Sequence, residues 1–157
     1  MANADQPKLG RLALIYFGFL ILTSVLLVVG VGVVESYFKV EVPTTGAAMA
    51  TIVFPAMLTG QNFARKSTRR PEAGEAWRFA GVVFAINFLL GAAILFSFLT
   101  LAGETATFLA MLQGDQSRIF LGMTLFVVVV QFWGTRFCFV MGANMTIKQI
   151  ERARSSG

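Results

Sequence analysis

Four long apolar segments constrain the fold of this chain more than any other feature. They cover residues 12–34, 46–64, 79–102 and 119–142, and the first three contain no charged side chain. A helix rises about 1.5 Å per residue, so segments of this length match a hydrocarbon core of about 30 Å. The pattern predicts an all-α protein, an integral membrane bundle of four transmembrane helices, in one membrane domain covering residues 1–157.

The distribution of basic residues predicts how these segments are oriented. Eleven of the 13 Lys and Arg residues lie before the first segment, between the second and third, or within and after the fourth. The two remaining connections hold only Lys39 and Arg118. Short loops rich in Lys and Arg stay in the cytoplasm, so both termini, the loop 65–78 and the tail 143–157 are expected there.

The net charge of +5 also points to a class of partner. The basic residues border apolar segments, which favours anionic membrane lipids over nucleic acid. The chain has no histidine, one cysteine (Cys138) and no paired acids in a plausible site. We therefore expect no catalytic, cofactor-binding or metal-binding residues, and a protein that is not an enzyme.

The connections and the second segment carry local predictions. The second segment is the least hydrophobic and contains Pro55, which suits the interior of a bundle. Pro71 is expected in the first turn of the third helix, with Glu72 and Glu75 near its N-terminus. Residues 104–113, in the second external loop, predict a short interfacial helix because four apolar side chains lie close together: Phe108, Leu109, Met111 and Leu112.

Small residues spaced four apart predict close contact between helices. This spacing occurs in the second and third segments, at Gly46/Ala50, at Ala56/Gly60/Ala64 and at Gly81/Ala85. Without bulky side chains, two helix backbones can approach closely. Packing within the chain and dimerisation explain the pattern equally well.

Arg136 is the strongest single candidate for a functional residue. An arginine inside a membrane segment is a candidate for an anion pathway or a buried ion pair. The alternative is that it lies about one turn inside the inner boundary and extends to phosphate headgroups. Phe132 and Trp133 precede it by four and three residues, so a local cation–π contact is also available.

Four amide side chains are the other candidates. With Arg136, they could form a polar lining through the bundle; alternatively, they make hydrogen bonds between helices. No Asp or Glu lies inside any segment, which weighs against a coupled transporter. The four are Asn87, Gln131, Gln61 and Asn62.

The loop 65–78 is a candidate site for lipid headgroups or an acidic partner. Arginine forks and nearby helix N-terminal amides suit phosphate. The alternative is that selection for cytoplasmic positive charge and helix capping produce the same composition. Its basic residues are Arg65, Lys66, Arg69, Arg70 and Arg78.

The same loop carries a resemblance to a family. Gly60-Gln61 and Phe63 at a polar helix end, followed by basic residues, Arg70-Pro71, Glu75 and an apolar helix, resemble a family of small four-helix bacterial inner-membrane proteins with no assigned function. The resemblance implies a location in the bacterial inner membrane and nothing catalytic. The leading expectation is a non-enzymatic accessory or scaffold membrane protein that packs against partner membrane proteins or forms a homo-oligomer. The alternative is a small transporter or channel component with a polar lining.

Overall fold

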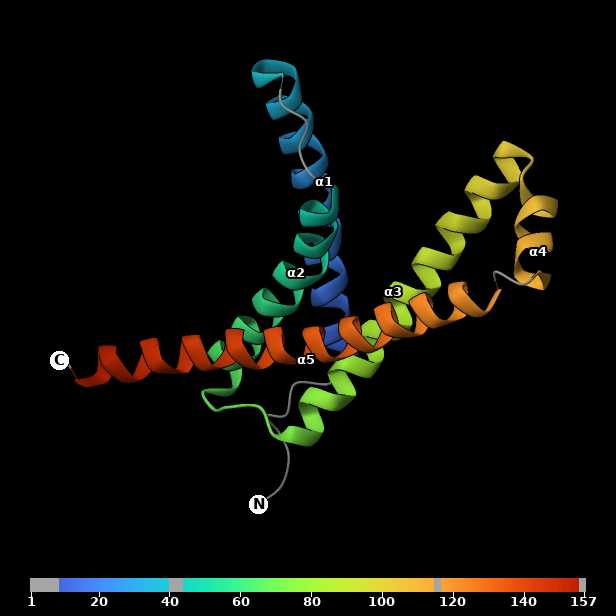
Figure 1. Cartoon of the computed structure of the whole chain (residues 1–157). Coiled ribbons are helices and arrows are strands. Elements are labelled where there is room, and N and C mark those ends of the chain that lie inside the picture. The colour runs from blue at the N-terminus through green and yellow to red at the C-terminus, as the bar shows by residue number, and fades with distance from the viewer. Residues whose placement is uncertain (1–8, 40–43, 115–116, 156–157) are drawn as a thin grey trace.

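The computed structural model describes residues 9–39, 44–114 and 117–155, and all the regular structure in them is helical. The helices are α1 (Leu9–Phe38), α2 (Thr44–Ser67), α3 (Ala73–Ala102), α4 (Thr105–Gln113) and α5 (Ser117–Ser155) (Figure 1). The all-α class is confirmed. The short helix expected at residues 104–113 is present as α4.

Three of these helices are long and apolar enough to cross a membrane. The most apolar windows of α1, α3 and α5 have mean hydropathies of 2.7, 2.5 and 1.7. α2, which is 24 residues long, does not reach this composition because Thr51, Pro55, Thr59, Gln61 and Asn62 interrupt its apolar residues. The structure therefore supports a membrane protein with three candidate spans.

The helices cross and diverge instead of running side by side along their lengths. α1 and α2 lie antiparallel, and α5 crosses α2 and α3 (Figure 1). The C-terminal half of α3, α4 and the first half of α5 form a second arm that points away from α1 and α2 (Figure 1). Packing is concentrated near the point where the helices cross.

Direct backbone contact between α2 and α5 explains this crossing. A Cβ atom added to Gly60 would lie 2.9 Å from the carbonyl carbon of Phe139, and one added to Gly142 would lie 2.9 Å from the carbonyl carbon of Met57. Neither position has room for a side chain. The small residues Ala56, Gly60 and Ala64, four apart on α2, are buried at this crossing or beside it. Packing within the chain thus accounts for Ala56, Gly60 and Ala64, whereas an added methyl group at Gly46 or Gly81 meets no atom within 4 Å.

An aromatic chain extends the core from α2 and α5 to α3 and α1. The rings of Phe63 and Phe139 meet edge to face at 5.7 Å, and Phe139 stacks on Phe79 at 4.2 Å. Phe79 then meets Tyr16 edge to face at 6.0 Å. All four side chains are fully buried, so this cluster joins all four long helices.

The start of α3 differs in detail from the prediction. Pro71 lies before the helix, because Glu72 is the N-cap and α3 begins at Ala73. Glu75 is the third residue of the helix, and its carboxylate accepts a hydrogen bond of 2.9 Å from the backbone N–H of Glu72. This interaction satisfies an amide that the first helical turn would otherwise leave unpaired.

Candidate functional site

Arg136 lies against an aromatic group built by α3 and α5. Its guanidinium carbon is 4.4 Å from the centre of the Trp77 ring, within cation–π range. Trp77 in turn stacks on Phe132 at 5.3 Å and meets Trp133 edge to face at 5.4 Å. The sequence predicts a local cation–π contact of Arg136 with Phe132 or Trp133. Arg136 instead contacts Trp77, which lies 59 positions earlier in the chain, because the rings of Phe132 and Trp133 pack on Trp77 themselves.

The guanidinium of Arg136 has no anionic partner among the described residues. Its Nε is buried without a hydrogen-bond acceptor. The side chain as a whole is half-buried, so its terminal amino groups reach the surface. An arginine carries five N–H donors in a planar fork, and here they are left free for an acceptor from outside this part of the chain.

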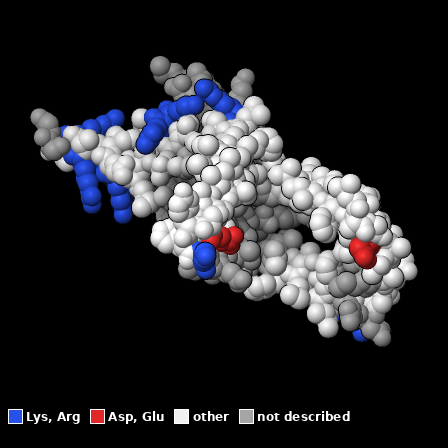
Figure 2. Space-filling view, turned by 90° about the horizontal axis from the view of Figure 1, so that it is seen from above, with Lys and Arg blue, Asp and Glu red and all other residues white. Residues whose placement is uncertain are grey.

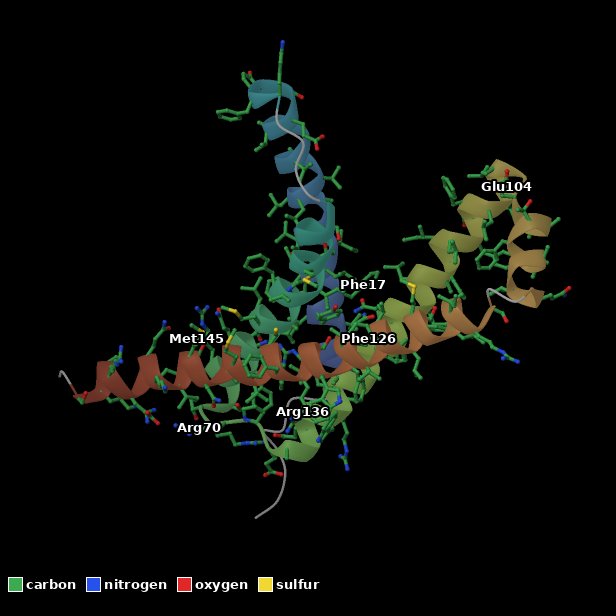
Figure 3. All side chains as sticks on the ribbon, viewed as in Figure 1. Phe17, Arg70, Glu104, Phe126, Arg136 and Met145 are labelled. Carbon is green, nitrogen blue, oxygen red and sulfur yellow. The ribbon has the colours of Figure 1, made fainter. Side chains whose placement is uncertain are left out.

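The contact with Trp77 indicates the depth of Arg136. Trp77 lies two residues before Phe79, where the apolar run of α3 begins. Tryptophan is enriched where membrane proteins pass from hydrocarbon to headgroups. In Figure 3, Arg136 lies near the crossing of α3 and α5, on the same side as Arg70, whereas Glu104 is at the opposite end of α3. The alternative in which Arg136 extends to headgroups stays a prediction.

Asn87 has a different environment. Its Nδ2 donates a 2.9 Å hydrogen bond to the hydroxyl of Tyr16, which joins α3 to α1. It lies ten residues beyond Trp77 on α3, about 15 Å along the helix axis. Asn87 and Arg136 therefore contact different partners at different positions along α3. The bond from Asn87 to Tyr16 is a hydrogen bond between helices, which is the alternative to a polar lining for this residue.

Among the described residues, no hydrogen bond joins the other three amides to Asn87 or Arg136. Gln61, Asn62 and Gln131 are half-buried, and the Oδ1 of Asn62 is buried without a hydrogen-bond partner. None of the five candidates lines either of two hollows on the surface. One, of about 540 Å³, lies between α1 and α3 and is entirely apolar in its side chains, and the other, of about 240 Å³, lies along α5 beside Phe137 and Lys148.

The basic loop between α2 and α3 divides into one structural arginine and several exposed cations. Arg69 donates two hydrogen bonds to Glu75, of 2.9 Å and 2.6 Å, in a bidentate pair. Its guanidinium also lies 5.4 Å from the centre of the Phe63 ring. Arg69 thus ties the end of α2 to the start of α3. The remaining basic residues of the loop are exposed: Arg65, Lys66, Arg70 and Arg78.

This ion pair changes the ionisation of both groups. The hydrogen bonds from Arg69 lower the pKa of the Glu75 carboxyl below its ordinary value, against an opposing effect of partial burial. The same bonds raise the pKa of the Arg69 guanidinium. Sequence spacing gave no direct signal for this pair, because the two residues are six apart across a turn and not three or four apart on one helix.

The charged side chains are distributed unevenly over the surface. Figure 2 shows basic side chains gathered over the left and top of the view, which includes the C-terminal end of α5, whereas the arm at the right is almost uncharged. Among the residues that the structure describes, no group of three or more His, Cys, Asp or Glu side chains could hold a metal ion.

Comparisons with known proteins add no relative. No family model matches the chain, and no curated protein or solved structure is similar to it. The resemblance to small bacterial inner-membrane proteins therefore stays a prediction.

Proposed function

We propose that this protein is a non-enzymatic accessory or scaffold protein of the bacterial inner membrane. In this proposal the chain crosses the membrane four times, with both termini in the cytoplasm, and its diverging arms pack against partner membrane proteins or against a second copy. The interior position of α2 supports its assignment as a fourth span, because a helix shielded by α1 and α5 tolerates a lower hydropathy.

The large exposed surface is the observation that carries the proposal. The chain exposes 11176 Å², whereas a compact monomer of 17.1 kDa is expected to expose about 7,800 Å². Obligate interfaces bury about 2,000–5,000 Å² in total, shared between the two partners, so an excess of roughly 3,400 Å² on one chain is at least what a permanent partner covers. The chain alone therefore leaves as much surface open as a permanent partner would cover.

This open surface is apolar and lies mainly on the arms. Every residue from 88 to 98 of α3 is exposed, and so are most residues of α5 from 119 to 130. Phe88, Phe96 and Phe98 are more than half exposed on α3. Lipid can cover such side chains, but it cannot supply the helix-to-helix packing that holds membrane bundles together. Two arms that diverge leave room for helices of another chain.

The positions of charged residues support the proposed orientation. Arg70 and Arg136 lie at one end of the molecule and Glu104 at the other (Figure 3). The other exposed cations of the same loop are Arg65, Lys66 and Arg78, so in the proposed orientation they lie with Arg70 on the cytoplasmic side. This arrangement gives the positive-inside pattern with the α2–α3 loop in the cytoplasm.

A photo-crosslinking experiment in intact membranes tests the proposal. A photoreactive amino acid replaces Phe96, which is 61% exposed on the α3 arm, or Phe79, which is 1% exposed in the core. We expect discrete protein adducts from position 96, either to this chain or to one partner, and none from position 79. Extraction in a mild detergent should then give a defined oligomer or complex. A monomer with no adduct from either position contradicts the proposal.

A further inference from the structure

The unpaired Arg136 beside Trp77 points to a lipid site distinct from the protein-binding arms. We propose that Arg136 and Trp77 bind the phosphate group of an anionic phospholipid at the inner end of α3 and α5. The inference rests on the proposed membrane orientation but not on the scaffold role, because a bound lipid needs no partner protein.

The first argument is the missing counter-ion. A partly buried cation without an anion is unfavourable, because the desolvation of the charge is not compensated. Arg136 makes no ion pair with a described acid, and its Nε has no acceptor. Glu75, in the first turn of α3, is already bound to Arg69 through both carboxylate oxygens. The anion for Arg136 therefore comes from outside this part of the chain.

The second argument is that the guanidinium is held in place. The ring of Trp77 lies 4.4 Å from its centre, and Trp77 is itself fixed between Phe132 and Trp133. A positioned fork loses less conformational freedom when it binds, and guanidinium groups bind phosphate oxygens in a bidentate manner. The exposed cations Arg70 and Arg78 make no cation–π contact among the described residues, so they lack this positioning.

The third argument identifies the source of the phosphate as a lipid. Trp133 and Phe137, which lie three residues before and one residue after Arg136 on α5, are 58% and 67% exposed. These apolar rings provide a surface for acyl chains next to the cation. Trp77 places the guanidinium where the apolar run of α3 begins, which is the depth of lipid headgroups in the proposed orientation. A net-anionic headgroup is favoured, because the cation has no acid beside it to bind a zwitterionic one.

The tryptophans make the site directly observable. The chain has only two, and both belong to this group. In a Trp133→Phe background, Trp77 is the only tryptophan, and its fluorescence is quenched by brominated lipid in contact with it. The protein is placed in nanodiscs of phosphatidylcholine containing either brominated phosphatidylglycerol or brominated phosphatidylcholine. We expect stronger quenching by phosphatidylglycerol, with a preference of about fivefold.

The variants separate a defined site from general attraction. Arg136→Gln should reduce the preference about fivefold, to near one, and Arg136→Lys should reduce it at least twofold because lysine keeps the charge without the fork. Arg78→Gln is the matched control, since it removes the same charge from an exposed position next to Trp77. It should leave the preference unchanged. If Arg136→Gln does not fold, the Arg136→Lys variant carries the test.

Three results would overturn the proposal. The background protein shows no preference for phosphatidylglycerol, or Arg78→Gln lowers the preference as much as Arg136→Gln, which indicates diffuse attraction. In the third, an excess of inorganic phosphate abolishes the preference in the background protein, which assigns the site to a soluble phosphate compound instead of a lipid.

Discussion

Replacing Gly60 by alanine tests whether the crossing of α2 and α5 depends on direct contact between their backbones. The new methyl group would lie 2.9 Å from the carbonyl carbon of Phe139 and 3.1 Å from the backbone nitrogen of Ala143. Carbon atoms prefer separations of about 3.5 Å or more, so the helices must move apart by at least about 0.6 Å. Both obstacles are backbone atoms of a helix and cannot rotate away.

Two opposing effects determine how much stability Gly60→Ala costs. Overpacking of a close-packed interior costs about 1–3 kcal/mol, and a backbone obstacle places Gly60→Ala near the upper limit. Alanine also favours the helix by up to about 1 kcal/mol relative to glycine. The net loss of stability is therefore about 2 kcal/mol, which lowers the melting temperature of a chain of this size by roughly 4–8 °C.

Cys138 provides the assay. It is the chain's only cysteine, and at 7% exposure it is buried in the same core as the crossing. A thiol-reactive fluorophore therefore labels it when heating opens this region in detergent. The matched control is Gly134→Ala on α5, where a methyl group meets no atom within 4 Å. This control should be neutral or slightly stabilising.

Gly142, the glycine that α5 contributes to the same crossing, provides a second test. A methyl group at Gly142 meets Met57 in the same way, so either substitution separates the same two backbones. The double variant should therefore lose less stability than the sum of the single losses. Equal melting temperatures for Gly60→Ala and Gly134→Ala would refute the reasoning, because the crossing would then have room for a side chain.

Two further predictions concern polar contacts. Tyr16→Phe removes the hydrogen-bond partner of Asn87 and should lower the stability in the same labelling assay by about 0.6 kcal/mol, and at most about 2 kcal/mol. A second substitution, Asn87→Leu, should recover much of this loss, because it removes the amide that Tyr16→Phe leaves without a partner. No recovery would argue against the bond. Arg69→Gln should cost up to about 1 kcal/mol, because the pair is partly exposed. Since the folded-state pKa of Glu75 is lowered, the contribution of the pair to stability is complete above a pH of about 4.5 and is lost as the pH falls through the folded pKa. The stabilities of wild type and Arg69→Gln should therefore converge in acid. A difference in stability that stays constant with pH contradicts the pair.

The sequence was sufficient to predict the elements but not their crossing. Apolar periods and lengths located the helices, and the acids at Glu72 and Glu75 marked the start of α3 to within two residues. The spacing of Ala56, Gly60 and Ala64 correctly indicated close approach. It could not identify α5 as the partner, because small residues permit contact with any smooth helix face.

The candidate site shows the same limit. Arg136 was identified from its unusual position in an apolar segment, but its contact with Trp77 depends on how α3 crosses α5. The five loop cations looked equivalent in the sequence, and only the folded turn distinguishes Arg69, which binds Glu75, from its exposed neighbours. Polar residues at similar positions in different segments also suggested one lining, whereas helix tilt and rotation place Asn87 and Arg136 with separate partners.

The length of α5 has a mechanical consequence. Gly142 divides its 39 residues unequally, with about 38 Å of helix toward Ser117 and about 20 Å toward Ser155. The backbones of α5 and α2 touch at Gly142, so we take this point as the pivot of a small tilt of α5. A tilt of about 10° would move the basic end by about 3 Å and the Ser117 end by about 6 Å. A ligand that draws the C-terminal end toward the membrane surface would therefore shift the far arm about twice as far.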